Sequence, residues 1–380
     1  MRRRQFNQYL TSTLIMAAMP SLAGAASLLE TSLAQEANSL HSEQHSQWLA
    51  SASVDDQGQH WLVVMNKLNE HKLVYPLPAR AHQVLKHPGK PWLFVAARRP
   101  GQYVIVVDMQ TGQLLKNIVP APDQHFCGHM LFSQDGRYLY TTENISTTSD
   151  GQVVVRDVED DFKILKQWPS GGLGPHQMKF LTDGKTLVIA NGGIHTRGRD
   201  KLNLDSMESN LSYLNMDSGE LIKQVKLTAD LSKLSIRHID INQHNDVLIA
   251  MQHQGDKTDL VPLVAVHNMA SGLRYLEIAD NDYFLLQHYC GSACFDLSGA
   301  CMAISAPRGD SVLFWDTRTA KFLGKYKVRD GCGLAASSVA DEFVVSSGKG
   351  RLYQLNPRTG SKKLLSKSAN MHFDNHLASV

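Results

Sequence analysis

The sequence predicts an all-β fold, a seven-bladed β-propeller of four-stranded blades. Three observations favour this class over two stacked sandwiches. A hairpin of two apolar strands around a Gly- or Asn-containing turn recurs from His82, His129, His176 and His238. A second hairpin, with an Asp- or Asn-containing turn, follows each of these. His82, His129 and His176 are spaced 47 residues apart, and a four-stranded repeat of about 40 to 50 residues is typical of a propeller.

The blades follow one another along the chain. An early unit covers residues 50–77 and precedes the regular copies. First hairpins are expected at residues 82–101, 129–144, 176–193 and 238–254, with degenerate copies at 294–309 and 333–350. Second hairpins are expected at residues 104–118, 153–168, 211–227, 263–278, 312–328 and 352–365. The count is about seven units of four strands.

The N-terminus has the features of an export signal. A basic cluster, a modest apolar run and the small residues Ala23 to Ala25 predict a signal peptide over residues 1–25. Arg3-Arg4-Gln5-Phe6 fits the twin-arginine pattern, although an ordinary secretory signal remains the alternative. We expect an N-terminal extension at 26–45, the propeller at 46–368, a C-terminal tail at 369–380, and a soluble periplasmic protein.

Composition restricts the partners. The net charge of +2 in 380 residues argues against nucleic acid and anionic membranes. After signal removal no apolar run approaches the ~18 residues of a membrane span. The five cysteines are an odd number, so at least one is free or paired outside the chain; they are either buried small residues or partly disulfide-bonded.

The repeat places four histidines at equivalent positions. Aligned on the hairpins, they all begin the first strand of consecutive blades, which lines the central channel of a propeller. Neutral imidazole is the commonest transition-metal ligand, so one channel mouth is predicted to bind a metal. Glu143 would add a carboxylate and favour iron, and His376 of the tail is a further candidate. The candidate ligands are His82, His129, His176, His238, Glu143 and His376.

A structural role for the histidines is the alternative. WD-type propellers carry a Gly-His pair whose histidine bonds within its own blade, about a dozen residues before the Asp-Gly turn. Here His129 lies six residues before Asp135, and His176 lies seven before Asp183. This spacing puts the histidines inside the strand rather than in the loop ahead of it.

Polar side chains close the second strand of each blade and are expected at the same mouth. The predicted pocket residues there are Arg98 or Arg99, Glu143, Asn191, Gln252 and Arg308, joined by Asn203 and by Cys294, which takes the histidine position in the sixth blade. The long connection at residues 191–210 is a candidate lid. Arginines beside protonatable histidines also suit a small anionic ligand or acid and base chemistry. Common nucleotide-binding, serine-hydrolase, zinc-protease and haem-attachment motifs are missing from the sequence.

Several stretches together resemble a known family. They are "CGHMLFSQDGRYLYTTEN", "GLGPHQMKFLTDGKTLVIANGGI", "LNLDSMESNLSYLN", "LSIRHI", "APRGD", "CGLA" and "FDNHL". They resemble an uncharacterised family of twin-arginine-exported, seven-bladed YVTN/WD-like propellers, associated with imelysin-type proteins and a di-haem thiol-oxidoreductase-like protein in iron-uptake clusters. His82, His129, His176, His238, Glu143, Asn191 and Asn203 fall on its motif positions, whereas Cys127 and Cys294 depart from them.

The resemblance implies a role in metal acquisition with an imelysin-like partner. We therefore predict a periplasmic propeller that binds a transition metal or metal complex, iron or copper rather than zinc, as an accessory or sensor in iron uptake. The alternatives are an enzyme, either a lactonase-like hydrolase or an oxidoreductase, using the same mouth, and a protein-interaction scaffold.

Overall fold

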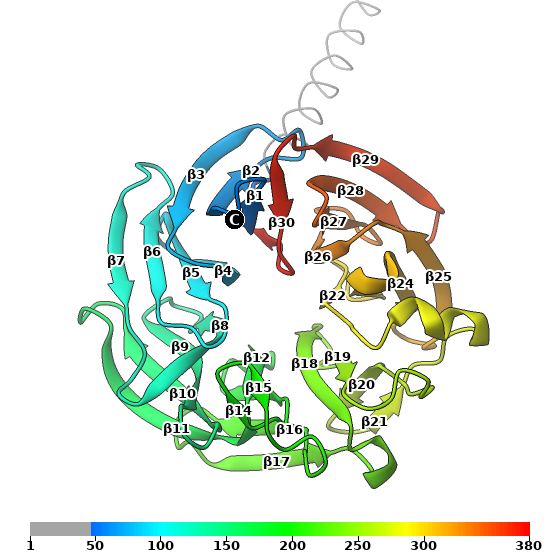
Figure 1. The fold of residues 1–380 in the computed structure, drawn as a ribbon, viewed down its shortest axis with the longest axis horizontal. Coiled ribbons are helices and arrows are strands. Elements are labelled where there is room, and N and C mark those ends of the chain that lie inside the picture. The colour runs from blue at the N-terminus through cyan, green and yellow to red at the C-terminus, as the bar shows by residue number, and fades with distance from the viewer. Residues whose placement is uncertain (1–46) are drawn as a thin grey trace, which may run out of the picture. The chain divides into compact units, whose positions relative to one another are not determined.

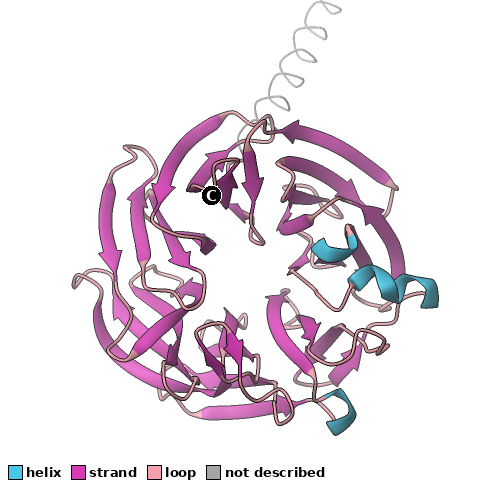
Figure 2. Cartoon of the chain, in the orientation of Figure 1, coloured by secondary structure: helices cyan, strands magenta, loops and turns pink. Residues whose placement is uncertain are grey.

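The computed structural model describes residues 47–380. The expected signal peptide and N-terminal extension lie outside these residues. The described chain forms seven antiparallel blade sheets arranged in a ring around a central channel, as the sequence predicts (Figure 1), and one further two-stranded sheet. Three short 3₁₀ helices are the helical elements of the described part: η1 (Ala229–Leu231), η2 (Asp280–Leu286) and η3 (Pro307–Gly309) (Figure 2). None of them is long and apolar enough to cross a membrane.

Blades 2 to 4 are each a four-stranded sheet with its first strand nearest the channel. Blade 2 has β4 (Ala81–Lys86), β5 (Trp92–Ala97), β6 (Val104–Asp108) and β7 (Leu114–Ile118). Blade 3 has β8 (Gln124–Phe132), β9 (Tyr138–Ile145), β10 (Asp150–Asp157) and β11 (Lys163–Leu173). Blade 4 has β12 (Pro175–Phe180), β13 (Thr186–Asn191), β16 (Asn210–Asn215) and β17 (Leu221–Lys226).

Blades 5 to 7 repeat the order. Blade 5 has β18 (Leu234–Ile241), β19 (Val247–His253), β20 (Val264–Asn268) and β21 (Gly272–Tyr275). Blade 6 has β22 (Ser292–Phe295), β23 (Cys301–Ala306), β24 (Ser311–Asp316) and β25 (Phe322–Lys327). Blade 7 has β26 (Gly331–Ala336), β27 (Phe343–Ser347), β28 (Arg351–Asn356) and β29 (Ser361–Lys367).

Blade 1 joins the two ends of the described chain. It consists of β1 (Leu49–Asp55), β2 (His60–Met65) and β3 (His71–Leu77), with β30 (Met371–Phe373) and β31 (Ala378–Ser379) added to β1. Ser53 pairs with Phe373, and Leu49 pairs with Ser379. Residues 369–380, expected as a tail beyond the propeller, therefore supply strands that close the ring. The innermost position of blade 1 belongs to β30 (Figure 1).

The core lies between neighbouring blades. Val64 of β2 packs in one cluster with Val84 of β4 and Val95 of β5, which joins blades 1 and 2. Phe94 of β5 packs with Phe126 and Phe132 of β8, which joins blades 2 and 3. Because both faces of each sheet are covered, its second strand reads as a continuous apolar run rather than an alternating one. The sequence "WLFVAA" of β5 is an example, with five consecutive buried residues.

Candidate functional site: a histidine cluster under a cationic cavity

Each histidine-bearing strand contains a β-bulge at its start. In blade 2, Ala81 pairs with Ala97 but Val84 pairs with Val95, so His82 and Gln83 together face one residue. A bulge adds an unpaired residue, bends the strand and re-aims its side chains. The same shift occurs between Pro175 and Met178. Between Phe126 and Met130 three residues oppose one, and between Ile236 and His238 the single residue Arg237 has no pairing partner. The recurring bulge explains why histidine side chains leave the sheet and enter the channel.

Glutamines beside two of the histidines tie the bulges to the next blade. Gln83 Oε1 accepts a hydrogen bond from the backbone N–H of Met130 at 2.6 Å. Gln177 Oε1 accepts one from the N–H of Ile239 at 3.0 Å. In each His-Gln pair the histidine side chain points into the channel, and the glutamine side chain binds the backbone of the next blade. This arrangement limits the freedom of the histidine backbone and preorganises the ring.

Gly128 allows the side chain of His82 to come close to β8, which carries His129. Its φ of +98° is a conformation that L-residues rarely adopt. A Cβ at this position would lie 2.7 Å from Cδ2 of His82. Glycine is therefore required at this position both by the positive φ and by the lack of space for a Cβ. Its small size allows His82 of β4 to pack against the bulge of β8.

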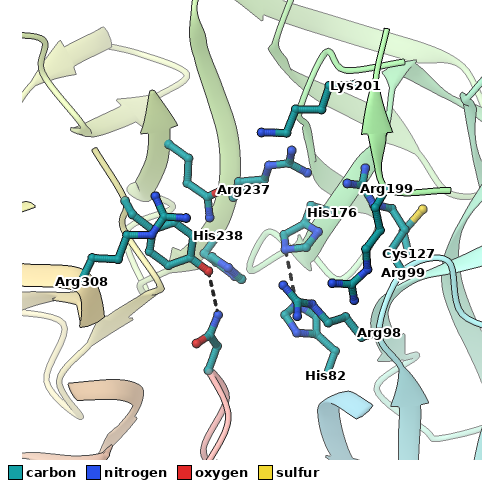
Figure 3. Close-up of a pocket in the computed structure, with 13 residues that line it drawn as sticks. His82, Arg98, Arg99, Cys127, His176, Arg199, Lys201, Arg237, His238 and Arg308 are labelled. Carbon is teal, nitrogen blue, oxygen red and sulfur yellow. Dashed lines mark hydrogen bonds between the residues drawn. The ribbon is translucent and has the colours of Figure 1, made fainter. Parts of the chain in front are cut away.

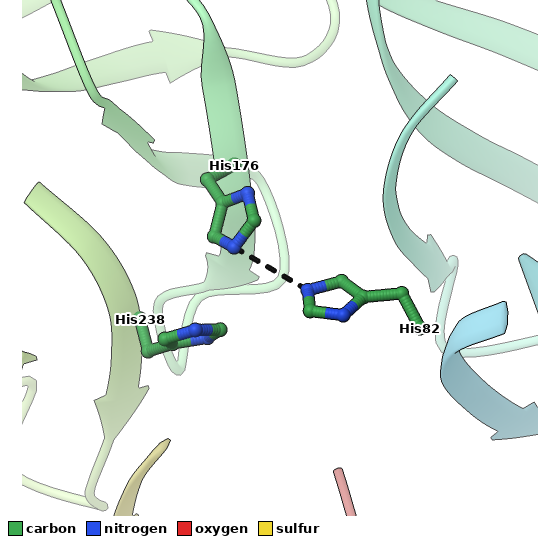
Figure 4. A group of neighbouring side chains, drawn as sticks. All are labelled: His82, His176 and His238. Atoms are coloured by element: carbon green, nitrogen blue, oxygen red, sulfur yellow. Dashed lines mark hydrogen bonds between the residues drawn. The ribbon is translucent and has the colours of Figure 1, made fainter. Parts of the chain in front are cut away.

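Five imidazoles meet in the channel: His82, His129, His176, His238 and His376. Nine pairs of their rings have centroids 4.5 to 6.0 Å apart. Nε2 of His82 is 3.4 Å from Nε2 of His176 (Figure 4). It is also 3.3 Å from Nε2 of His376. The four histidines of the repeat converge as the spacing predicts, and the closing segment brings the fifth.

The cluster contains two groups of three ligand atoms with metal-compatible spacing. One is His82, His176 and His238, and the other is His82, His129 and His376; within each, the ligand nitrogens lie within 4.8 Å of one another. Two nitrogens bound at about 2.0–2.1 Å to one tetrahedral metal are about 3.3–3.4 Å apart, which is the separation seen around His82. His82 belongs to both groups and is their common member.

Several of these nitrogens are buried without a hydrogen-bond partner among the described residues. Both ring nitrogens of His129 are in this state, as is Nδ1 of His82, His176 and His238. Buried polar atoms are otherwise nearly always satisfied, so an unpaired set in one place indicates a ligand site.

Burial and mutual repulsion keep the imidazoles neutral. Burial lowers the pKa of His82, His129, His176 and His238 well below 6.5, and the neighbouring histidines lower it further. The pKa of His376 is lowered to about 4, mainly by burial, with Asp374 opposing the shift. A neutral imidazole is the form that coordinates a metal, because its lone pair is free.

A cavity of about 240 Å³ opens beside the cluster. His82, His176, His238 and Cys127 line it together with Gln252, Tyr289 and Asn375. The remaining lining residues are all cations: Arg98, Arg99, Arg199, Lys201, Arg237 and Arg308. Figure 3 shows Arg308 on one side, Arg98, Arg99 and Arg199 on the other, and the histidines between them.

Some expected pocket residues lie at this cavity. Arg98, Gln252 and Arg308 line it. The long connection between β13 and β16 also reaches it, because its small hairpin of β14 (Thr196–Arg197) and β15 (Asp200–Lys201) supplies Arg199 and Lys201. Arg308 lies 4.3 Å from the ring centre of Tyr289, whose hydroxyl accepts a 3.0 Å hydrogen bond from Asn375.

Glu143 does not lie at the mouth, contrary to the sequence-based expectation. Its side chain is 0% exposed and forms an ion pair of 2.7 Å with Arg156, which is 1% exposed. It also accepts hydrogen bonds from the Thr141 hydroxyl and from the Ala121 backbone N–H. The carboxylate belongs to the interior of blade 3, because its oxygens are directed at β10 and the preceding loop.

Asn191 and Asn203 have structural partners instead of lining the cavity. Asn191 donates to the Ser170 carbonyl and to Asn210, and accepts from the Ser170 hydroxyl at 2.7 Å. Asn203 donates to the Gly193 carbonyl and accepts from the His195 N–H, which fixes the loop that carries Arg199 and Lys201. Asn203 thus acts on the cavity only through that loop.

Cys294 also lies away from the cavity. It is buried in β22 and packs with Phe314 and Val345 in the core between blades 6 and 7. All five cysteines are free and buried, so the alternative of partial disulfide bonding is wrong. Burial raises the pKa of Cys127 to about 12 and that of Cys294 well above 9. These thiols are protonated at neutral pH, which argues against a thiolate mechanism.

Sequence reasoning missed three of the six cations. Arg98 and Arg99 were expected as alternatives, and both line the cavity. Arg199, Lys201 and Arg237 were not singled out, although Arg237 directly precedes His238 in "SIRHI". In strict alternation neighbouring side chains point to opposite faces of a sheet, so Arg237 would face away from the histidine. The bulge between Ile236 and His238 breaks that alternation and places both at the cavity. The usable signal was the run of basic residues "TRGRDK" in the expected lid.

The sequence matches the family described as "Protein of unknown function (DUF1513)" over residues 75–380. The chain belongs to this family. No curated protein matches it in sequence. Among solved structures, hydrazine synthase of Kuenenia stuttgartiensis is similar in fold, with a TM-score of 0.61 and 13% sequence identity. The alignment covers 84% of this chain and 95% of the hydrazine synthase chain. At this identity the likeness concerns the propeller fold alone.

Proposed function

We propose that this member of the DUF1513 family binds a transition metal through the channel histidines. The observation that carries the proposal is the set of buried, neutral imidazoles whose unpaired nitrogens have the spacing of a metal-ligand set. Imidazole donors suit copper, iron, zinc and nickel. Any metal held here would be shielded from bulk water on the histidine side, and His82 would be shared by either ligand group.

Iron or copper remains the proposed metal: the resemblance implies iron, and the imidazole donors also suit copper. With Glu143 paired to Arg156, the protein supplies nitrogen donors only, a set that suits copper directly. Iron, the harder ion of the two in its oxidised form, would need oxygen donors from a second ligand. We place the protein in the periplasm after twin-arginine export, as an accessory or sensor in iron uptake with an imelysin-like partner; the motif resemblance and the Arg3-Arg4-Gln5-Phe6 pattern support this.

Metal titration of untagged mature protein tests the metal site. We expect one tightly bound equivalent of Cu(II) or iron by elemental analysis, and a loss of affinity of at least about 100-fold in His82→Ala, since even outer-shell changes cost about 10- to 100-fold. His244→Ala is the matched control, because His244 is exposed on a turn of blade 5. Absence of stoichiometric metal, or unchanged affinity in His129→Ala and His176→Ala, would overturn the proposal.

The partner is tested separately. A purified imelysin-like protein should bind the propeller in a pull-down whether or not His82 is replaced, because the cluster lies inside the channel. Failure to bind would remove the partner from the proposal and leave the metal site unaffected.

A further inference from the structure

The cavity beside the histidines is lined by an uncompensated set of positive charges. Its six cations come from four blades: Arg98 and Arg99 follow β5, Arg199 and Lys201 lie in the loop of blade 4, Arg237 is in β18, and Arg308 is in η3. Among the described residues that line the cavity there is no Asp or Glu. Six like charges around one space repel one another, and only an anion would compensate for that repulsion.

Within residues 47–380 none of the six cations forms an ion pair. The described salt bridges use other side chains, such as Arg80 with Asp374 and Arg137 with Asp157. Lys201 has a neutral partner, the Gln254 side-chain oxygen at 2.5 Å. Arg308 stacks on Tyr289, which leaves its guanidinium edge free of a carboxylate. Four other arginines of the described chain, Arg80, Arg137, Arg156 and Arg358, are paired with carboxylates, whereas the five arginines at the cavity are not.

Arg237 supplies the strongest single observation. Its side chain lines the cavity although the residue is only 5% exposed, and its Nε has no hydrogen-bond partner among the described residues. Nη1 of Arg99 is unpartnered in the same way. Burial and the charge of Arg99 lower the pKa of Arg237 to about 9, which still leaves it protonated at neutral pH. A buried, charged and unpaired guanidinium is costly unless a ligand completes it.

We infer that this cavity binds a small polycarboxylate, an anion with two or three carboxylate groups. A guanidinium presents a planar fork that pairs with one carboxylate through two parallel hydrogen bonds. Arg308 stands across the cavity from Arg98 and Arg99 (Figure 3), so separate carboxylates on one molecule reach both sides, whereas a compact phosphate reaches one. The cavity volume of about 240 Å³ limits the ligand to a small molecule.

The polycarboxylate site goes beyond the proposed metal site and adds to it. Because His82, His176 and His238 line the same cavity, an anion held by the arginines lies beside the metal ligands. Its carboxylate oxygens would supply the hard donors that the protein lacks once Glu143 is excluded. This link rests on the proposed function, whereas binding of the anion to the arginines does not.

The test uses chelator-treated, metal-free mature protein and isothermal titration calorimetry. The probe is tricarballylate, a tricarboxylate, with acetate and inorganic phosphate as comparison anions. We expect one molecule of tricarballylate per chain, bound at least about tenfold more tightly than either comparison anion, with affinity falling steeply as salt rises.

Two variants locate the site and guard against misfolding. Arg237→Gln and Arg308→Gln should each weaken tricarballylate binding about 10- to 100-fold, because each removes a charge-assisted hydrogen-bonding group. Arg308 is exposed, so its replacement is not expected to prevent folding and its variant can be tested if Arg237→Gln does not fold. Arg318→Gln, on an exposed outer turn, is the control.

Each outcome of the titration has a definite meaning. No binding of any anion, or equal binding by the arginine variants, would overturn the site. Tighter binding of phosphate than of tricarballylate would overturn the polycarboxylate class. Because the protein is metal-free, loss of metal binding in the histidine variants would leave these results unchanged, so the two proposals fail independently.

Discussion

Replacement of Gly128 by Ala should disrupt the histidine cluster from outside its ligand set. Gly128 has φ +98°, and a Cβ there would lie 2.7 Å from Cδ2 of His82. An ordinary contact begins near 3.4 Å. The His82 ring would therefore have to retreat by about 0.7 Å, which exceeds the ~0.5 Å tolerance of a working ligand set.

Two effects follow from this change and can be separated. Alanine at positive φ strains the backbone, at a cost of about 1–3 kcal/mol in the free energy of unfolding. Displacement of His82 reduces metal affinity, by at least about tenfold, because His82 belongs to both ligand groups. Gly184→Ala is the matched control, since Gly184 has φ +65° and its added Cβ would meet nothing within 4 Å.

The assay combines urea unfolding of the metal-free protein with metal titration of the folded one. We expect both variants to lose stability and only Gly128→Ala to lose metal affinity. Equal metal affinity in Gly128→Ala and wild type would refute the reasoning that the close approach of β8 positions His82. A loss of metal affinity in Gly184→Ala would mean that backbone strain, and not displacement of His82, lowers the metal affinity.

Three further predictions concern Glu143, pH and ring closure. Glu143→Gln leaves Arg156 buried and unpaired, so unfolding measurements should show a loss of about 3–5 kcal/mol with metal stoichiometry unchanged; loss of metal from the folded variant would restore Glu143 as a ligand. Since the pKa of His376 falls from 6.5 to about 4 on folding, the unfolded chain binds more protons between these values, and His376 alone should cost metal-free protein at most about 3 kcal/mol as pH falls from 6.5 to 4, in addition to the losses from the other channel histidines. Urea midpoints should show a shallower pH dependence in His376→Ala, and identical slopes would contradict the shift. Deletion of residues 371–380 removes β30 and β31, two of the three strands that pair with β1, so circular dichroism should show loss of cooperative unfolding, whereas His376→Ala should retain it.

The fold was predictable because its signal is repeated. Two hairpins per blade, each with its own turn chemistry, recur often enough that the degenerate copies at 294–309 and 333–350 can be recognised from the regular ones. The closure was not predictable in the same way. The three-residue strand β30 lacks a hairpin partner in sequence, and it becomes a strand only because β1 offers an open edge.

The site was predictable where equivalence between blades decides it. His82, His129, His176 and His238 occupy one register position, so ring geometry alone brings them together. Glu143 ends its strand at the expected offset, yet its carboxylate pairs with Arg156, which lies on the neighbouring strand β10. Arg237 faces the cavity because of a bulge, and bulges leave no clear mark on hydrophobic alternation. The direction of side chains at strand ends and bulges therefore could not be predicted from the sequence.

The central claim, that the channel histidines form a metal site, is tested most directly by electron paramagnetic resonance of protein loaded with one equivalent of Cu(II). The account predicts a single species with hyperfine splitting from several imidazole nitrogens, which is lost in His82→Ala and kept in His244→Ala. A spectrum without nitrogen couplings, or one that His82→Ala leaves unchanged, would contradict it.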